Sequence, residues 1–127
     1  MKLKYFSILI FAFTFLACEE PKVCLNDEEA SSIIYQFPDS IPAAYSHDLI
    51  IHYVIENSCG SFLEFDDTTY GNVVEISTML RYEGCNCALE FVEDSMSYQI
   101  LHDTAGTFLY KFSIGESDFD THSLLVY

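Results

Sequence analysis

From residue 48 to the C-terminus, apolar and polar residues alternate with a period of two, and this alternation restricts the fold more than any other feature. It places one row of side chains on each face of an extended chain and so predicts half-buried β-strands. The clearest inward rows are Val74, Ile76, Thr78, Leu80 and Tyr82; Met96, Tyr98 and Ile100; and Phe108, Tyr110, Phe112 and Ile114. No convincing amphipathic helix accompanies them.

Turn-forming residues separate the predicted strands at intervals of about 8–12 residues. The predicted turns or breaks are at residues 57–60, 66–72, 83–84, 93–94, 103–106 and 115–119. Both rows are largely apolar at the start of residues 48–56, which favours a central strand. Residues 31–37 are predicted to form an edge strand that ends at Pro38. About seven or eight short strands with this spacing predict an all-β fold, an antiparallel β-sandwich over residues 31–127.

The N-terminus has the features of an export signal. Lys2 and Lys4 precede an apolar run of 12 residues, 5–16, and the small residue Ala17 follows. A basic start, a short apolar core and a small residue before the cut are typical of a secretory signal peptide. The run is too short for a transmembrane helix, which needs roughly 20 residues. Residues 1–17 are therefore predicted to be a signal peptide.

The end of this signal, residues 15–18 (Phe-Leu-Ala-Cys), resembles a bacterial lipobox, although Phe15 stands where Leu is commoner. The Phe-rich core resembles lipoproteins of the Bacteroidota. The resemblance implies cleavage between Ala17 and Cys18, a diacylglycerol thioether on Cys18, and an acyl chain such as palmitate on its amine. Two or more acyl chains hold a protein stably on a membrane. The alternative is an ordinary cleaved signal with Cys18 as a disulfide partner.

The resemblance also implies a location on the outer membrane, facing either the periplasm or the cell surface. Glu19 and Glu20 directly follow Cys18. An acidic pair at this position resembles the signal that sends such lipoproteins to the outer leaflet. The alternative is that the two glutamates simply belong to a solvated acidic tether, which is predicted for residues 18–30.

The charge of the chain excludes one class of partner. Residues 18–127 keep all 20 acidic residues and only three of the five basic ones, so their formal net charge is −17. Such a field repels phosphates and argues against nucleic-acid binding. Disorder is also disfavoured, because aromatic residues make up 16% of the chain and supply a core.

Four cysteines follow Cys18, namely Cys24, Cys59, Cys85 and Cys87. An even set in an exported chain predicts disulfides. We favour Cys59 with Cys85 or Cys87, and Cys24 with the one left over, because a Cys85–Cys87 bond would close a strained ring. The alternative is a zinc ion held by all four thiolates, although the usual C-x₂-C spacing is missing.

Two further resemblances concern the domain itself. Residues 103–112 resemble the corner of immunoglobulin-like domains, in which a small turn leads into a strand with alternating aromatics, although Phe108 occupies the usual tyrosine position. This resemblance implies an immunoglobulin-like sandwich. A wider resemblance to small uncharacterised Bacteroidota lipoproteins implies no activity. It covers residues 57–62, 74–76, 82–87 and 106–108.

No spacing of residues predicts catalysis. The Cys85-Asn86-Cys87 pair lacks a thioredoxin-like context, and the four histidines lie far apart in the sequence. The acidic loops are better candidates, because calcium takes several oxygen ligands from flexible loops. The calcium candidates are Asp66, Asp67, Asp118 and Asp120. No other cofactor is expected.

The leading functional hypothesis is a lipid-anchored, non-enzymatic binding, adhesion or structural module of the cell envelope. Its partners would be the membrane, through the lipid, and an envelope protein or glycan. One alternative is an accessory subunit of an envelope uptake complex. Another is a small hydrolase or an inhibitor of one.

Overall fold

The computed structural model describes residues 24–127, and this part of the chain is all-β, as the alternation predicts. Eight strands follow one another without a helix in the described residues. They are β1 (Leu25–Ala30), β2 (Ser40–Ile41), β3 (His47–Asn57), β4 (Gly60–Tyr70), β5 (Val73–Glu83), β6 (Leu89–Ile100), β7 (Gly106–Gly115) and β8 (Asp118–Val126).

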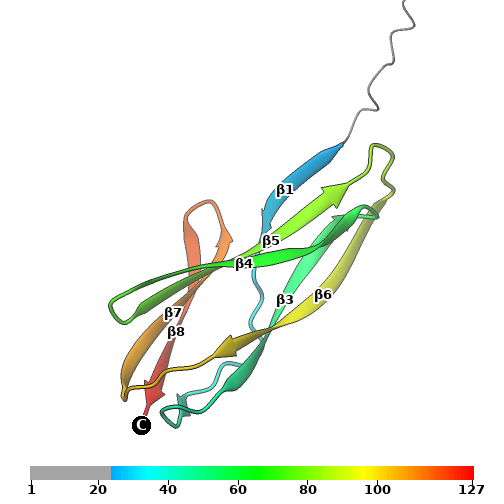
Figure 1. Cartoon of the computed structure of the whole chain (residues 1–127). Coiled ribbons are helices and arrows are strands. Elements are labelled where there is room, and N and C mark those ends of the chain that lie inside the picture. The colour runs from blue at the N-terminus through cyan, green and yellow to red at the C-terminus, as the bar shows by residue number, and fades with distance from the viewer. Residues whose placement is uncertain (1–23) are drawn as a thin grey trace, which may run out of the picture.

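The strands form two sheets that pack face to face (Figure 1). The larger sheet has the order β1-β5-β7-β8-β2, and β4 pairs with the other edge of β5. β1 and β7 share one edge of β5 in succession, since β1 pairs with Thr78 to Glu83 and β7 with Val73 to Ile76. The smaller sheet consists of β3 and β6. The coarse prediction of a β-sandwich is therefore confirmed.

The antiparallel pairing predicted for the sandwich is confirmed for four strand pairs and is wrong for two, which are parallel. β5 runs parallel to β7, and β2 runs parallel to β8. β5 and β7 point the same way because β6, which lies between them in the chain, crosses to the other sheet. Alternation within a strand does not encode the direction of its neighbour, and parallel neighbours require a long connection of this kind.

The predicted tether at residues 18–30 is wrong from Leu25 onward, because β1 begins there and the sandwich starts before residue 31. No period-two row marks β1, whose side chains are almost all exposed. The strand is held by backbone pairing with β5 and by Arg81, whose guanidinium donates to Asp27 at 2.8 and 3.0 Å. This contact lowers the pKa of Asp27, chiefly through the hydrogen bond.

Three other local predictions are also corrected. β4 extends through Asp66 and Asp67, which were expected in a turn, and β6 continues through Glu93 and Asp94 without a break. The predicted edge strand at residues 31–37 shrinks to one bridge, between Ile33 and His52. β4 and β6 stay extended at these positions because a neighbouring strand supplies hydrogen bonds, which a single-strand pattern does not reveal.

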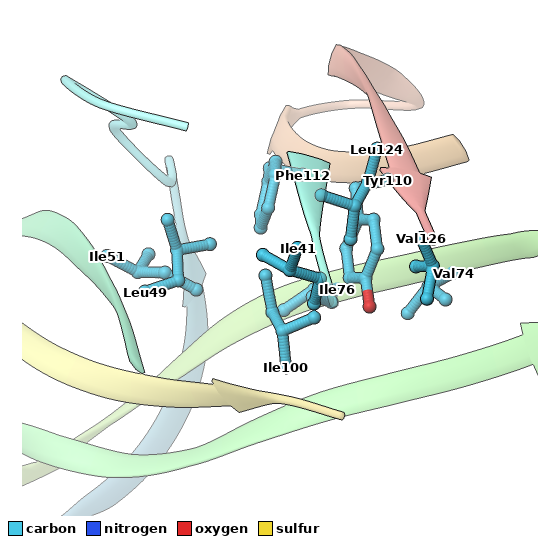
Figure 2. Close-up of a cluster of buried hydrophobic side chains, with 10 residues drawn as sticks. All are labelled: Ile41, Leu49, Ile51, Val74, Ile76, Ile100, Tyr110, Phe112, Leu124 and Val126. Atoms are coloured by element: carbon cyan, nitrogen blue, oxygen red, sulfur yellow. The ribbon is translucent and has the colours of Figure 1, made fainter. Parts of the chain in front are cut away.

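The core lies between the two sheets (Figure 2). On β5, buried and half-buried residues alternate along nearly the whole strand, as its sequence predicts. The main cluster consists of Ile41, Leu49, Ile51, Val74, Ile76, Ile100, Tyr110, Phe112, Leu124 and Val126. Full burial of each aliphatic or aromatic side chain stabilises the fold by roughly 1.5–3 kcal/mol.

Two adjacent leucines on β8 test whether one face of the strand is buried in the core while the other is exposed. Leu124→Ala is expected to lower the free energy of unfolding by roughly 2–5 kcal/mol, because the Leu124 side chain is fully buried. Leu125→Ala is the matched control and should change it by less than about 0.5 kcal/mol, since Leu125 is 51% exposed. Urea denaturation measures both values, and equal losses would contradict the face assignment.

Candidate functional site

The candidate site is a groove beside strand β3, formed where the chain crosses from one sheet to the other. Residues 33–41 begin at the edge of β3, where Ile33 and His52 exchange two backbone hydrogen bonds of 2.8 and 3.0 Å. They end at the edge of β8, which pairs with β2. Chain segments that switch sheets in this way form the corners of sandwiches.

Phe37 determines the path of this crossing. Its ring stacks on His122 at a centroid distance of 4.8 Å and lies 5.5 Å from Tyr110 and 6.0 Å from Phe112. Phe37 is half-buried and packs against β7 and β8, and residues 34–38 leave the edge of β3 to reach this position. The two hydrogen bonds at His52 are therefore the only backbone hydrogen bonds within residues 24–127 that join this segment to β3.

The separation of the two segments leaves an open groove of about 840 Å³, which we call the β3 groove. One wall is the crossing segment and the other is the first half of β3. The lining residues are Tyr35, Gln36, Phe37, Pro38, His47, Asp48, Leu49, Ile50 and His52. Drug-sized ligands bind in pockets of about 300–1,000 Å³, so the β3 groove has the capacity of a binding site.

A polar cluster lies at the His52 end of the groove. The Tyr35 hydroxyl donates to Glu93 at 2.5 Å, and His52 Nδ1 lies 3.5 Å from the same carboxylate oxygen. The rings of Tyr35 and His52 meet edge to face, with centroids 4.7 Å apart. The hydrogen bond to Glu93 raises the pKa of Tyr35, so the phenol keeps its proton. The cluster offers an exposed aromatic face beside a carboxylate, an arrangement suited to binding.

A second network links His102, which follows β6, to β7. His102 Nε2 lies 2.7 Å from the Tyr110 hydroxyl, and the His102 ring stacks on Phe108 at 3.7 Å. Burial lowers the pKa of His102 and raises that of Tyr110 to about 12. Both groups are therefore uncharged near pH 7, and their hydrogen bond places no charge in the core. This network stabilises the fold rather than forming an open site.

This network predicts a pH dependence of stability. The pKa of His102 is lower in the folded protein than its ordinary value of 6.5, so the unfolded chain takes up the proton first. The contribution of His102 is complete above pH 6.5 and is lost as the pH falls through the folded pKa. Between pH 7.5 and about pH 5 the wild type should lose more stability than His102→Gln. Denaturation of the two proteins across this range tests this, and parallel profiles for wild type and His102→Gln would contradict it.

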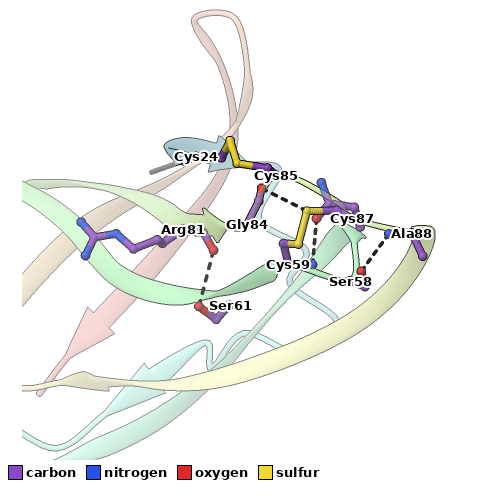
Figure 3. Close-up of a disulfide and its surroundings, with 10 residues drawn as sticks. Cys24, Ser58, Cys59, Ser61, Arg81, Gly84, Cys85, Cys87 and Ala88 are labelled. Carbon is purple, nitrogen blue, oxygen red and sulfur yellow. Dashed lines mark hydrogen bonds between the residues drawn. A yellow bond between two sulfur atoms is a disulfide. The ribbon is translucent and has the colours of Figure 1, made fainter. Parts of the chain in front are cut away.

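The four predicted disulfide cysteines form two disulfides at one end of the sandwich (Figure 3). Cys24 pairs with Cys85, and Cys59 pairs with Cys87, so the favoured pairing scheme is confirmed and the zinc alternative is wrong. Both bonds converge on the loop between β5 and β6. Gly84 is required there, since its φ is +134° and an added Cβ would lie 2.8 Å from Cys59 Sγ.

The two disulfides span different lengths of chain, which gives a graded test of their effect. Cys24→Ala with Cys85→Ala should lower the free energy of unfolding by roughly 2–4 kcal/mol, because the bond joins residues 61 positions apart. Cys59→Ala with Cys87→Ala opens a span of 28 and should cost about 0.7 kcal/mol less by loop entropy alone. Thermal denaturation compares the two variants. If either variant were as stable as the wild type, the disulfide that it lacks would not stabilise the fold.

The calcium candidates do not come together. Asp67 and Asp120 occupy the two ends of one row across the sheet, with Ile76 and Phe112 between them. Three strand spacings separate them by roughly 14 Å. Asp67 accepts a hydrogen bond from Tyr98 at 2.7 Å, and Asp120 contacts His122 at 3.0 Å. In the described part of the chain no three His, Cys, Asp or Glu residues gather to hold a metal ion.

Other predicted sites lie outside the described residues. These are the cleavage site at Ala17 and Cys18, the lipidation of Cys18, and the export signal at Glu19 and Glu20. Sequence reasoning missed Tyr35 and Ile50, the large hydrophobic residues of the groove lining that are exposed. One signal was present, because Ile50 is an apolar residue on the outward row of β3. Apolar residues on both rows favour a central strand, whereas β3 has an open edge and Ile50 is 46% exposed.

Comparisons with protein-family models, with curated proteins and with solved structures find no match for this chain. Residues 24–127 contain no helix long and apolar enough to cross a membrane. The two disulfides are typical of proteins outside the cytoplasm.

Proposed function

We propose that this chain is a non-enzymatic binding module of the bacterial cell envelope, anchored in the outer membrane through lipid on Cys18. The signal-like residues 1–17 and the lipobox resemblance support the anchor. The disulfides are consistent with an exported domain.

The observation that carries the binding role is the position of the β3 groove. Cys24, the described residue nearest to Cys18 in the chain, lies at the end of the sandwich where β1 begins (Figure 1). β2 and the start of β3, next to the groove, lie at the opposite end. An anchor at Cys18 would therefore leave the groove on the far side of the domain from the lipid, where an envelope protein or glycan can reach it.

The proposal includes an immunoglobulin-like type of sandwich. The corner at residues 103–112 supports it, because Gly106 opens β7 and aromatic residues alternate along that strand. In such corners a tyrosine hydroxyl bonds to the backbone a few residues earlier. Here Phe108 holds that tyrosine position, and the Tyr110 hydroxyl pairs with the His102 side chain instead. The parallel β5–β7 pair departs from the antiparallel sheets of that type.

Membrane fractionation tests the anchor. Cys18→Ala should move the protein from the membrane fraction to the soluble fraction, because no acyl chain then holds it. Glu19→Gln with Glu20→Gln is the matched control and should stay in the membrane fraction, while protease treatment of intact cells should cleave less of it. If the Cys18→Ala protein remains on the membrane, the lipid-anchor proposal fails.

A further inference from the structure

The free edge of β3 carries hydrogen-bonding groups that face the groove. In an extended strand, the N–H and C=O of one residue point to one edge and those of the next residue to the other. At His52 both groups point away from β6, because both bond to Ile33. By the same alternation, those of Ile50 and Asp48 point to this edge too, where the crossing segment has already moved away.

The interrupted pairing also defines a register. Continuing the antiparallel bridge between Ile33 and His52 would place Tyr35 opposite Ile50. Instead, the chain bends at Tyr35 and the β3 groove occupies the position of the missing strand. The groove is thus a space beside an existing strand edge, with a two-bond bridge at one end and a turn at the other.

We propose that an extended, basic segment of a partner polypeptide binds in the β3 groove and adds a strand to β3, bonding to the backbone of Ile50 and Asp48. This is recognition by strand addition, in which main-chain hydrogen bonds supply affinity and alternate side chains supply specificity. The inference rests on the proposed binding function and specifies its partner.

The basic character of the partner follows from charge. Residues 24–127 hold 18 acidic and two basic residues, a formal net charge of −16. Both basic side chains have acidic neighbours, Arg81 with Asp27 and Lys111 with Glu75, and neither lines the groove. A second copy would bring the same negative charge to the edge and be repelled, whereas a Lys- or Arg-rich segment would be attracted.

Side chains at the groove fit the same partner. Asp48 is exposed in the lining, and Glu93 lies beside the Tyr35 ring, so a basic side chain placed there has a carboxylate and an aromatic face within reach. Ile50, 46% exposed, and Tyr35, 64% exposed, offer apolar surface to the alternate residues of the added strand. A partner segment in which basic and β-branched residues alternate matches both the carboxylates and the apolar surface of the groove.

Proline at position 50 tests the backbone contact directly. Ile50→Pro removes the one N–H of this residue, which points to the groove and takes no part in pairing with β6, so the fold should persist. Ile50→Val keeps the N–H and is the matched control. The probe is the peptide Lys-Val-Lys-Thr-Lys-Val-Lys with a fluorescent label, and fluorescence anisotropy with the purified full chain measures its Kd.

We expect the wild type and Ile50→Val to bind the peptide equally and Ile50→Pro to bind at least about fivefold more weakly, the effect of one lost hydrogen bond. Binding should weaken with added NaCl. Replacing every Lys of the peptide by Glu, or methylating its alternate backbone nitrogens, should abolish binding. Circular dichroism confirms that both variants are folded. If Ile50→Pro unfolds, the methylated peptide still decides whether backbone bonds are made.

Three results would overturn the inference. The first two are equal binding of the methylated and unmethylated peptides, and failure of the basic peptide to bind the wild type. The third is a dimer in sedimentation velocity that Ile50→Pro dissociates, because this result would assign the groove to a second copy. The proposed function fails separately. If the basic peptide does not bind but the chain co-sediments with isolated envelope glycan, the binding module stands and the strand-addition partner does not.

Discussion

The position of every other strand in the larger sheet depends on the pairing of β5 along both of its edges. β4 covers one edge, and β1 and β7 share the other. Every second side chain of β5 from Val74 to Tyr82 is buried, so a slip of one residue would turn this row to solvent. The parallel pairing of β5 with β7 requires β6 to cross to the second sheet, and this crossing places β3 and β6 over the core.

Whereas both edges of β5 are paired, the crossing of residues 33–41 leaves one edge of β3 open. The half-buried Phe37 packs against Tyr110, Phe112 and His122 and so gains core contacts, and the edge of β3 loses its neighbour beyond His52. Open edges pair readily with other chains, and proteins commonly protect them with charge. Here a net charge of −16 over the described residues opposes pairing with a second copy. The same charge favours a basic partner.

Much of the fold was predictable from single strands. The alternation at residues 74–82 and 108–114 predicted β5 and β7, and the even number of cysteines in an exported chain predicted disulfides. The prediction failed where neighbours decide the conformation. β1 has no apolar row and is extended because β5 and Arg81 hold it. β4 carries Asp66 and Asp67 because its backbone bonds to β5.

The candidate site was the least predictable feature, for the same reason. Tyr35 and Glu93 are 58 positions apart, and no local pattern links them to each other or to Ile50. The sequence by itself determined the strand periodicity, the acidic charge and the presence of four cysteines in the domain, because these are properties of residues and their spacing. Only the tertiary structure decided strand direction, disulfide pairing and the open edge of β3, because each depends on which distant segments become neighbours. The packing of Phe37 shows this most directly, since its contact with β7 and β8 accompanies the groove beside β3.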